Sequence, residues 1–225
     1  MKKYLTPTIF CSILFLFSNA QKINFEYGLH GGINIGSANG NAISKDYKSV
    51  LIGPSFGGHV KLNVTNQFGI KVLAQYDQYG WMYRSLTFVS ANGTDLVKGN
   101  VLHKLNYLNL PVLAEYSYGS KIKFNIHAGI FLGIPLSNKI VIKYQAPLPA
   151  NQPSTTESSS DYYKKMNFGI SVGTGLQVPV TKKLKLTFDV SDYYGLSNIY
   201  KSQTGSGNVI KTNAVTISTG FTISM

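Results

Sequence analysis

The sequence predicts an all-β fold, an eight-stranded antiparallel up-and-down β-barrel that spans a membrane. In eight segments, apolar residues alternate with polar or small residues at a period of two. These segments are joined alternately by short turns and long polar loops, as in bacterial outer-membrane barrels. No stretch of the mature chain approaches the roughly 18 consecutive apolar residues of a helical span. Membrane crossing must therefore be made by strands.

The N-terminus predicts export from the cytoplasm. Lys2 and Lys3 precede an apolar run at 9–17, and Ser18-Asn19-Ala20 supplies the small residues of a cleavage site. We expect residues 1–20 to be a cleaved signal peptide and residues 21–225 to form one outer-membrane barrel domain. The only cysteine, Cys11, lies in the removed part, so the mature chain should have no disulfide and no thiol nucleophile.

The chain is strongly basic, with a formal net charge of +12, and +10 once Lys2 and Lys3 are removed. Export argues against a nucleic-acid partner, and the basic residues form no cluster. We expect basic residues near the strand ends to face the phosphates of outer-leaflet lipids, including lipopolysaccharide, although ordinary solvated loop residues are the alternative for each. They are Lys45, Lys48, Arg84, Lys98, Lys143, Lys164 and Lys165.

The first four strands are expected at 25–35, 55–62, 68–81 and 107–116, because each sets aliphatic or aromatic residues against Gly, His, Lys or Glu. The first two are separated by a polar stretch at 36–53, and the second and third by a short turn at 63–67. Residues 82–104 leave the apolar pattern and are expected to form a long loop.

The last four strands are expected at 122–134, 168–178, 184–191 and 215–225. Short turns at 118–121 and 179–183 join two pairs of neighbours. Three prolines and a Ser/Thr run ending at residue 160 predict a mobile exposed loop, and a Gly/Ser/Asn-rich loop follows around 196–211. Four long loops and three short turns place both termini on one side, the periplasm, and the long loops outside the cell.

The polar face of the strands should line the interior, because a lysine facing hydrocarbon at the membrane midplane costs roughly 2–4 kcal/mol. An eight-stranded barrel is just wide enough for its own side chains, so we expect a filled interior of paired charges without a wide pore. The inward-facing set is Glu26, His30, His59, Lys61, Lys71, Asp77, Glu115, Lys123, His127, Lys185 and Asp189.

Aromatic residues near the strand ends predict two interfacial girdles, since amphipathic rings prefer the membrane surface. The expected extracellular girdle contains Tyr76, Tyr79, Trp81, Tyr107, Tyr162, Tyr163, Tyr193 and Tyr194. The expected periplasmic girdle contains Phe25, Phe68, Tyr116, Tyr118 and Phe221.

The run Tyr107-Leu108-Asn109-Leu110-Pro111-Val112-Leu113, with a Gly-rich first strand before it, resembles the PorT-like outer-membrane β-barrel family of Gram-negative bacteria. The resemblance implies an integral outer-membrane barrel and, for some members, a part in protein secretion or gliding. It transfers no catalytic residue. Pro111 lacks a backbone donor, so we expect a bulge or bend there.

We expect no catalytic residue, metal or cofactor. His103 near the loop rim, with Asp77, Asp161 or Asp192 as an orienting carboxylate, is the one arrangement that could serve as a general base. His30, His59 and His127 lack the spacing of metal ligands and should be interior side chains.

The leading hypothesis is therefore a non-enzymatic barrel that anchors surface loops for envelope integrity, adhesion, or an envelope or secretion complex with a protein partner. A small porin or transporter, and a hydrolase that uses His103, are the alternatives.

Overall fold

A computed structural model describes residues 24–44, 46–89, 96–144, 155–159, 162–201 and 207–225. The expected signal peptide lies outside these residues. The described chain contains nine strands. They are β1 (Asn24–Asn39), β2 (Lys48–Asn63), β3 (Phe68–Val89), β4 (Leu96–Tyr118), β5 (Lys123–Tyr144), β6 (Thr155–Ser158), β7 (Asn167–Pro179), β8 (Leu184–Gly195) and β9 (Lys211–Ser224).

Eight of these strands close into a barrel, which confirms the predicted fold class. Consecutive barrel strands pair antiparallel, and β4 pairs with β5 to join the two halves of the sheet. The ring is completed by β1 and β9, which pair from Glu26↔Ser224 to Asn39↔Lys211. The short β6 lies outside the ring and pairs only with β5, from Lys139↔Ser158 to Ile142↔Thr155.

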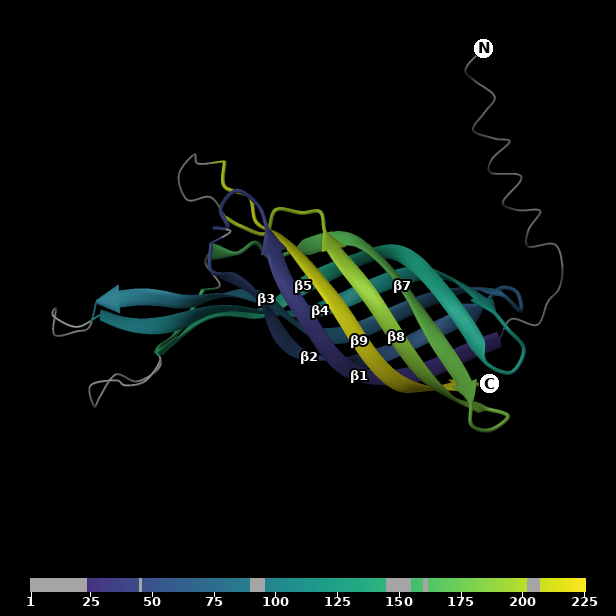
Figure 1. Cartoon of the computed structure of the whole chain (residues 1–225). Coiled ribbons are helices and arrows are strands. Elements are labelled where there is room, and N and C mark those ends of the chain that lie inside the picture. Colours follow the sequence, from purple (N-terminus) through teal and green to yellow (C-terminus); the bar gives the residue numbers. More distant parts are fainter. Residues whose placement is uncertain (1–23, 45, 90–95, 145–154, 160–161, 202–206) are drawn as a thin grey trace, which may run out of the picture.

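Short turns join the strands at one end of the barrel, which we call the turn end. Two of them have the same hydrogen bond. The side-chain oxygen of Thr65, and likewise that of Thr181, accepts a hydrogen bond from the backbone N–H three residues later, at 2.9 and 3.0 Å. A threonine hydroxyl that bonds its own turn in this way holds the chain reversal in place. The third turn uses Gly119, whose φ of 115° favours glycine. Both the start of β1 and the C-terminus lie at this end (Figure 1).

At the opposite end, the loop end, the strands run further than the alternation predicted. The ladder between β3 and β4 continues to Val89↔Leu96, and the one between β4 and β5 to Gly99↔Tyr144. These strands project beyond the barrel (Figure 1). The expected loop at 82–104 is therefore wrong for most of its length, as is the expected polar loop at 36–53, because β1 and β2 also continue into it.

The strands are longer than predicted because alternation in the sequence marks only the part of a strand that has one face in hydrocarbon. The backbone hydrogen bonds of the ladder do not require hydrocarbon and continue beyond that part. Residues 155–158 of the expected Ser/Thr-rich loop likewise form a strand, β6. Residues 145–154 of that loop lie outside the described chain.

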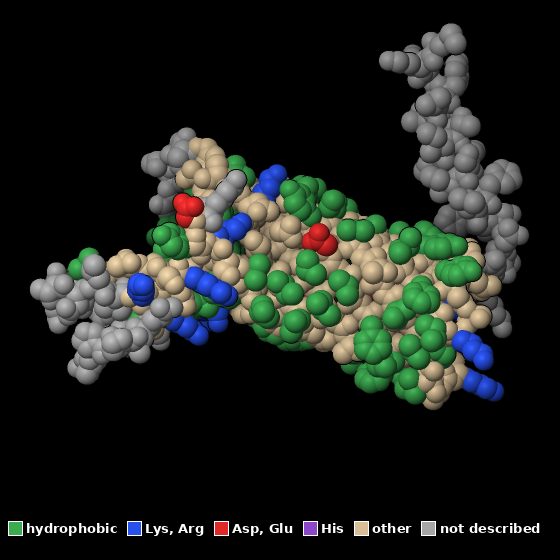
Figure 2. Space-filling view, viewed as in Figure 1, with side chains coloured by type: hydrophobic (Ala, Val, Ile, Leu, Met, Phe, Trp, Pro, Cys, Tyr) green, Lys and Arg blue, Asp and Glu red, His purple; other side chains and the backbone are tan. Residues whose placement is uncertain are grey.

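The two faces of the barrel differ as expected. Large apolar side chains cover the outside, and Leu29, Ile126 and Ile130 each expose 63–73% of their surface. Figure 2 shows such side chains spread over the barrel wall, with lysine and arginine gathered near the two ends. The polar set predicted to face inward is buried or half-buried throughout. Within the described residues, no helix is long and apolar enough to cross a membrane.

The structure has no bulge at Pro111, but the β3–β4 ladder is interrupted there, with no pair between Val72↔Val112 and Gln75↔Asn109. Pro111 faces inward opposite Phe131, and the β4–β5 register is unbroken from Tyr107 to Tyr118. The register shifts instead at the next step, where Tyr107 pairs with Pro135 and Asn106 with Ser137, so Leu136 is the extra residue. The proline that marks a bulge is thus Pro135, where a missing donor is least costly.

Replacing Ile130 with lysine should destabilise the barrel by about 2–4 kcal/mol, because it places a charge on the hydrocarbon-facing wall. Urea titration of folding into phospholipid vesicles measures this difference. Ser120→Lys, in the exposed turn after β4, is the control and should change stability by less than about 0.5 kcal/mol. Equal stability of Ile130→Lys and the control would contradict the assignment of this face to lipid.

Candidate functional site in the barrel interior

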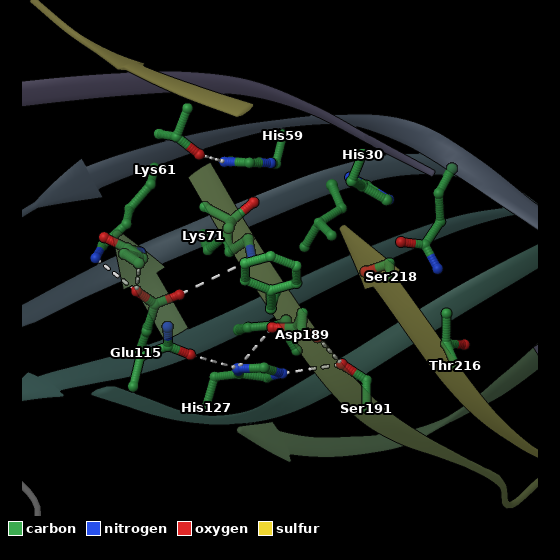
Figure 3. Close-up of a pocket in the computed structure, with 18 of the residues that line it drawn as sticks. His30, His59, Lys61, Lys71, Glu115, His127, Asp189, Ser191, Thr216 and Ser218 are labelled. Atoms are coloured by element: carbon green, nitrogen blue, oxygen red, sulfur yellow. Dashed lines mark hydrogen bonds and ion pairs between the residues drawn. The ribbon is translucent and has the colours of Figure 1, made fainter. Parts of the chain in front are cut away.

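The interior near the turn end is organised around Glu115, a fully buried carboxylate on β4. It accepts a hydrogen bond from Lys61 Nζ on β2 at 2.6 Å, and Lys71 Nζ on β3 lies 3.9 Å from its other oxygen. Ser117 and Gln177 also donate to it, at 3.3 and 3.4 Å. Strands β2, β3, β4 and β7 are thus joined through one side chain (Figure 3).

A second group lies across the interior. His127 Nε2 is 3.1 Å from Ser191 Oγ, and His127 Nδ1 is 3.7 Å from Asp189. These are the residue types of a hydrolase triad, but the Ser191 hydroxyl donates directly to Asp189 at 2.6 Å and so is not poised as a nucleophile. Figure 3 shows the group in the same enclosed space as Glu115. Nearer the turns, Lys185 and Glu26 form a further ion pair at 2.5 Å.

The interior histidines do not form a metal site. His30 and His59 stack with ring centroids 6.1 Å apart, and His59 Nε2 lies 3.2 Å from Thr222 Oγ1. His127 belongs to the separate Ser191–Asp189 group. In the described part of the chain, no three His, Cys, Asp or Glu side chains converge as metal ligands do.

Asp77 forms the middle layer. Its carboxylate is fully buried and accepts hydrogen bonds from the amides of Asn34, Gln75 and Asn109, at 3.1, 2.7 and 2.5 Å. Asn34 in turn accepts from Thr216 at 2.8 Å, which continues the network to β9. Among the described residues no lysine or arginine pairs with Asp77, so neutral amides stabilise its charge.

Between Asp77 and the loop end, the interior is filled mainly by aromatic and aliphatic side chains, and this layer closes the loop end. Tyr79, Trp81 and Tyr107 are at most 1% exposed. Side chains from three loop-end segments pack on them, so the loops themselves form part of the plug. We call this cluster the mouth plug; it consists of Ala38, Ile43, Tyr79, Trp81, Leu105, Tyr107, Tyr163, Ile199, Ile210 and Ala214.

Between the layers, the polar interior retains a cavity of about 30 Å³. A site needs at least 10–15 Å³ to hold one water, so this space suits one or two waters and no organic substrate. Its lining includes His30, Lys71, Glu115, His127 and Asp189. The predicted interior of paired charges is confirmed for the turn-end half, whereas the apolar plug of the other half was not foreseen.

The structure does not bring His103 together with Asp77 or Asp192, two of the three carboxylates considered for it. His103 stacks on Trp81 with centroids 4.5 Å apart, and its Nδ1 lies 3.2 Å from the Tyr163 hydroxyl. Asp77 is committed to the amide network, and Asp192 faces the outer wall of β8 between Val172 and Val215. Asp161 lies outside the described residues. No described carboxylate forms an ion pair with His103.

The expected extracellular girdle is wrong for five of its aromatic residues. Tyr79, Trp81, Tyr107, Tyr163 and Tyr193 are buried, whereas Tyr162 and Tyr194 are exposed. The sequence contained a signal that three of them face inward. Tyr79 and Trp81 are two and four residues from Asp77 and so lie on its face of the strand, and Tyr107 lies on the face of Asn109 for the same reason. The periplasmic set is on the outside as predicted, with Phe25, Phe68, Tyr116, Tyr118 and Phe221 exposing 41–69% of their surface.

A sequence model described as "Outer membrane protein beta-barrel domain" matches residues 18–201. The chain belongs to this family. It is thus an outer-membrane β-barrel protein, as the sequence predicted. No curated protein matches the chain significantly.

Three solved structures with a similar fold are distant from this chain in sequence. A major outer membrane protein from Thermus thermophilus is 10% identical, with 91% of this chain and 100% of that chain covered and a TM-score of 0.48. Outer membrane protein W of E. coli is 13% identical, with 89% and 98% covered and a TM-score of 0.45. The E. coli outer membrane protease OmpT is 9% identical, with 92% and 99% covered and a TM-score of 0.41.

Replacing Glu115 with leucine should cost about 3–5 kcal/mol of unfolding free energy, because Lys61 and Lys71 lose their buried counter-charge. Urea unfolding in detergent measures the loss. The same substitution at Glu157, exposed on β6, is the control and should cost less than about 0.5 kcal/mol. If the two variants unfold at the same urea concentration, Glu115 does not hold the interior together.

Proposed function

We propose that this chain is a non-enzymatic outer-membrane barrel that anchors its loop end outside the cell. There it contributes to envelope integrity, adhesion, or the assembly of an envelope or secretion complex. The observation that carries this proposal is the contrast between the two regions of the molecule. The interior is filled from the turn end to the mouth plug, while β3, β4 and β5 continue beyond the barrel. The part of the chain that can contact a molecule outside the cell is therefore the loop end.

The orientation in this proposal has both termini in the periplasm. It is supported by the asymmetry of the connections, since bacterial barrels have short periplasmic turns and longer extracellular loops. The turns after β2, β4 and β7 are short, and both described termini lie beside them.

A small porin or transporter is less well supported. A path along the axis would have to pass the Glu115 ion pairs, the Asp77 amide network and the mouth plug. Eight-stranded barrels have little interior space to begin with, and here about 30 Å³ of cavity remains.

A hydrolase is also less well supported. His103 is stacked on Trp81 of the mouth plug and has no carboxylate partner among the described residues. The Ser191–His127–Asp189 group has no room for a substrate.

Among the proposed roles, the PorT-like resemblance favours a part in protein secretion or gliding. Its motif lies on β4, where Tyr107 belongs to the mouth plug and Asn109 bonds Asp77. The motif residues thus serve the packing of the barrel, and no described contact assigns them a partner.

In planar lipid bilayers, the purified barrel should show no sustained open current, because ion pairs and aromatic rings fill its axis. Single-channel recording measures this, with an established porin in the same bilayers as the positive control. A stable, repeatable conducting state of the wild-type chain would overturn the closed barrel in favour of the porin alternative.

A photo-reactive amino acid at Thr87, exposed on the projecting part of β3, should capture a partner in living cells. Placed at Thr181, in a turn at the opposite end, it should not capture the same species. Gel mobility and mass spectrometry of the adducts identify what is captured. Capture of one common species from both positions, or none from Thr87, would contradict loop-end recognition.

A further inference from the structure

A lateral cavity opens at the loop end, where strand β5 is no longer paired with β7. β5 and β7 pair only as far as Gly133↔Asn167, and β6 begins to pair at Lys139. Residues 134–137 of β5 therefore have no strand partner on this side within the described chain, and at the next residue the Ser159 N–H donates to Asn138 O at 3.0 Å. The bulge at Leu136 falls in the same stretch. The result is a cavity of about 380 Å³ between β5 and the segments around 164 and 201.

The floor of this cavity belongs to the lipid-facing wall. Ile134 and Leu136 expose 39% and 56% of their surface. Ile134 continues the outward-facing row of Ile126 and Ile130 on the same strand, and Phe168 on β7 is exposed beside it. An acyl chain that lies along the barrel would meet this floor.

The rim of the cavity is cationic. Lys164, Lys165 and Lys201 line it, and none of the described residues that line it is acidic. No ion pair joins these lysines to another residue that the structure describes. Three like charges within one cavity repel one another and favour an anionic ligand.

The rim is also held in place. The Lys164 N–H donates to Ile199 O at 2.7 Å, and the Lys201 N–H donates to Tyr162 O at 2.9 Å. Between them, Tyr163 is paired with Tyr200 and is anchored in the mouth plug. Burial raises the pKa of the Tyr163 hydroxyl, so it stays neutral beside the lysines. The backbone positions of Lys164 and Lys201 are therefore fixed by contacts with the barrel.

A polar group in the wall completes the site. Asn138 lines the cavity and is 3% exposed, and its side-chain oxygen has no described hydrogen-bond partner. A phosphate oxygen accepts hydrogen bonds, so the amide serves such a ligand in the orientation that turns its NH2 into the cavity. Few buried polar atoms lack a partner unless a ligand or water supplies one.

We propose that this cavity binds a phosphate-bearing membrane lipid, with its phosphate on Lys164, Lys165 and Lys201 and its first acyl carbons on Ile134 and Leu136. Charge complementarity selects the phosphate, and the exposed aliphatic floor selects a lipid over a soluble anion. The inference rests on the proposed orientation, which places the loop end in the outer leaflet. It does not depend on what the projecting strands contact.

The test is native mass spectrometry of the folded chain in detergent micelles, with diphosphorylated lipid A as the probe and its dephosphorylated form for comparison. The phosphorylated lipid should bind at least about tenfold more tightly. Replacing Lys164, Lys165 and Lys201 together with glutamine should weaken its binding about tenfold or more, and Lys165→Gln alone roughly threefold to fivefold.

The matched control replaces Lys121, Lys182 and Lys183, which are exposed in the short turns, with glutamine. This variant has the same net charge as the first and should bind lipid A within about twofold of the wild type. Heat-dependent gel mobility checks that every variant is folded, and the single variant keeps the test decisive if the triple one is not.

Unchanged binding by the loop-end lysine variants would overturn the site, as would an equal loss in the control. Leu136→Gln tests the aliphatic floor and should weaken lipid A binding while leaving any binding of inorganic phosphate unchanged. If millimolar inorganic phosphate displaces lipid A, the ligand is a soluble anion and the lipid assignment is wrong. None of these outcomes bears on the cross-linking at Thr87.

Discussion

Closure of the hydrogen-bond ladder between β1 and β9 is the constraint on which the rest of this structure depends. In hydrocarbon, an unpaired backbone N–H or C=O costs several kcal/mol, so a sheet can cross a membrane only if it has no free edge. The antiparallel register from Glu26↔Ser224 to Asn39↔Lys211 removes the edge. Closure with eight strands also sets the diameter, and a barrel of this width encloses only side chains.

That narrow diameter explains the chemistry of the interior. Polar residues must face inward because the outside meets lipid, and once inside they must satisfy one another. Glu115 therefore bonds Lys61 and lies near Lys71, while three amides surround Asp77. Towards the loop end, aromatic side chains and residues from the loops close the barrel. Because the axis is filled, the surfaces left accessible to other molecules are the outer wall and the loop end.

The sequence pattern predicted some elements well and others poorly for one physical reason. Alternation is strong where one face meets lipid, so β7, expected at 168–178, is observed as Asn167–Pro179. It fades where both faces meet water, so β3 and β4 were expected to stop near Trp81 and to begin near Tyr107. Their pairing continues to Val89 and Leu96, because main-chain hydrogen bonds do not depend on the side-chain pattern.

The alternation along the chain was sufficient to predict the membrane-spanning architecture and the inward-facing charges, because a period of two separates lipid-facing from interior positions residue by residue. Tertiary structure decided which interior residues meet, since strands such as β2 and β4 are not neighbours and are connected only across the enclosed space. It also decided that Tyr163 and Ile199 from distant loops complete the mouth plug, and that β5 parts from β7 beside three lysines. Such contacts depend on register, barrel width and loop paths, which periodicity along one strand does not contain.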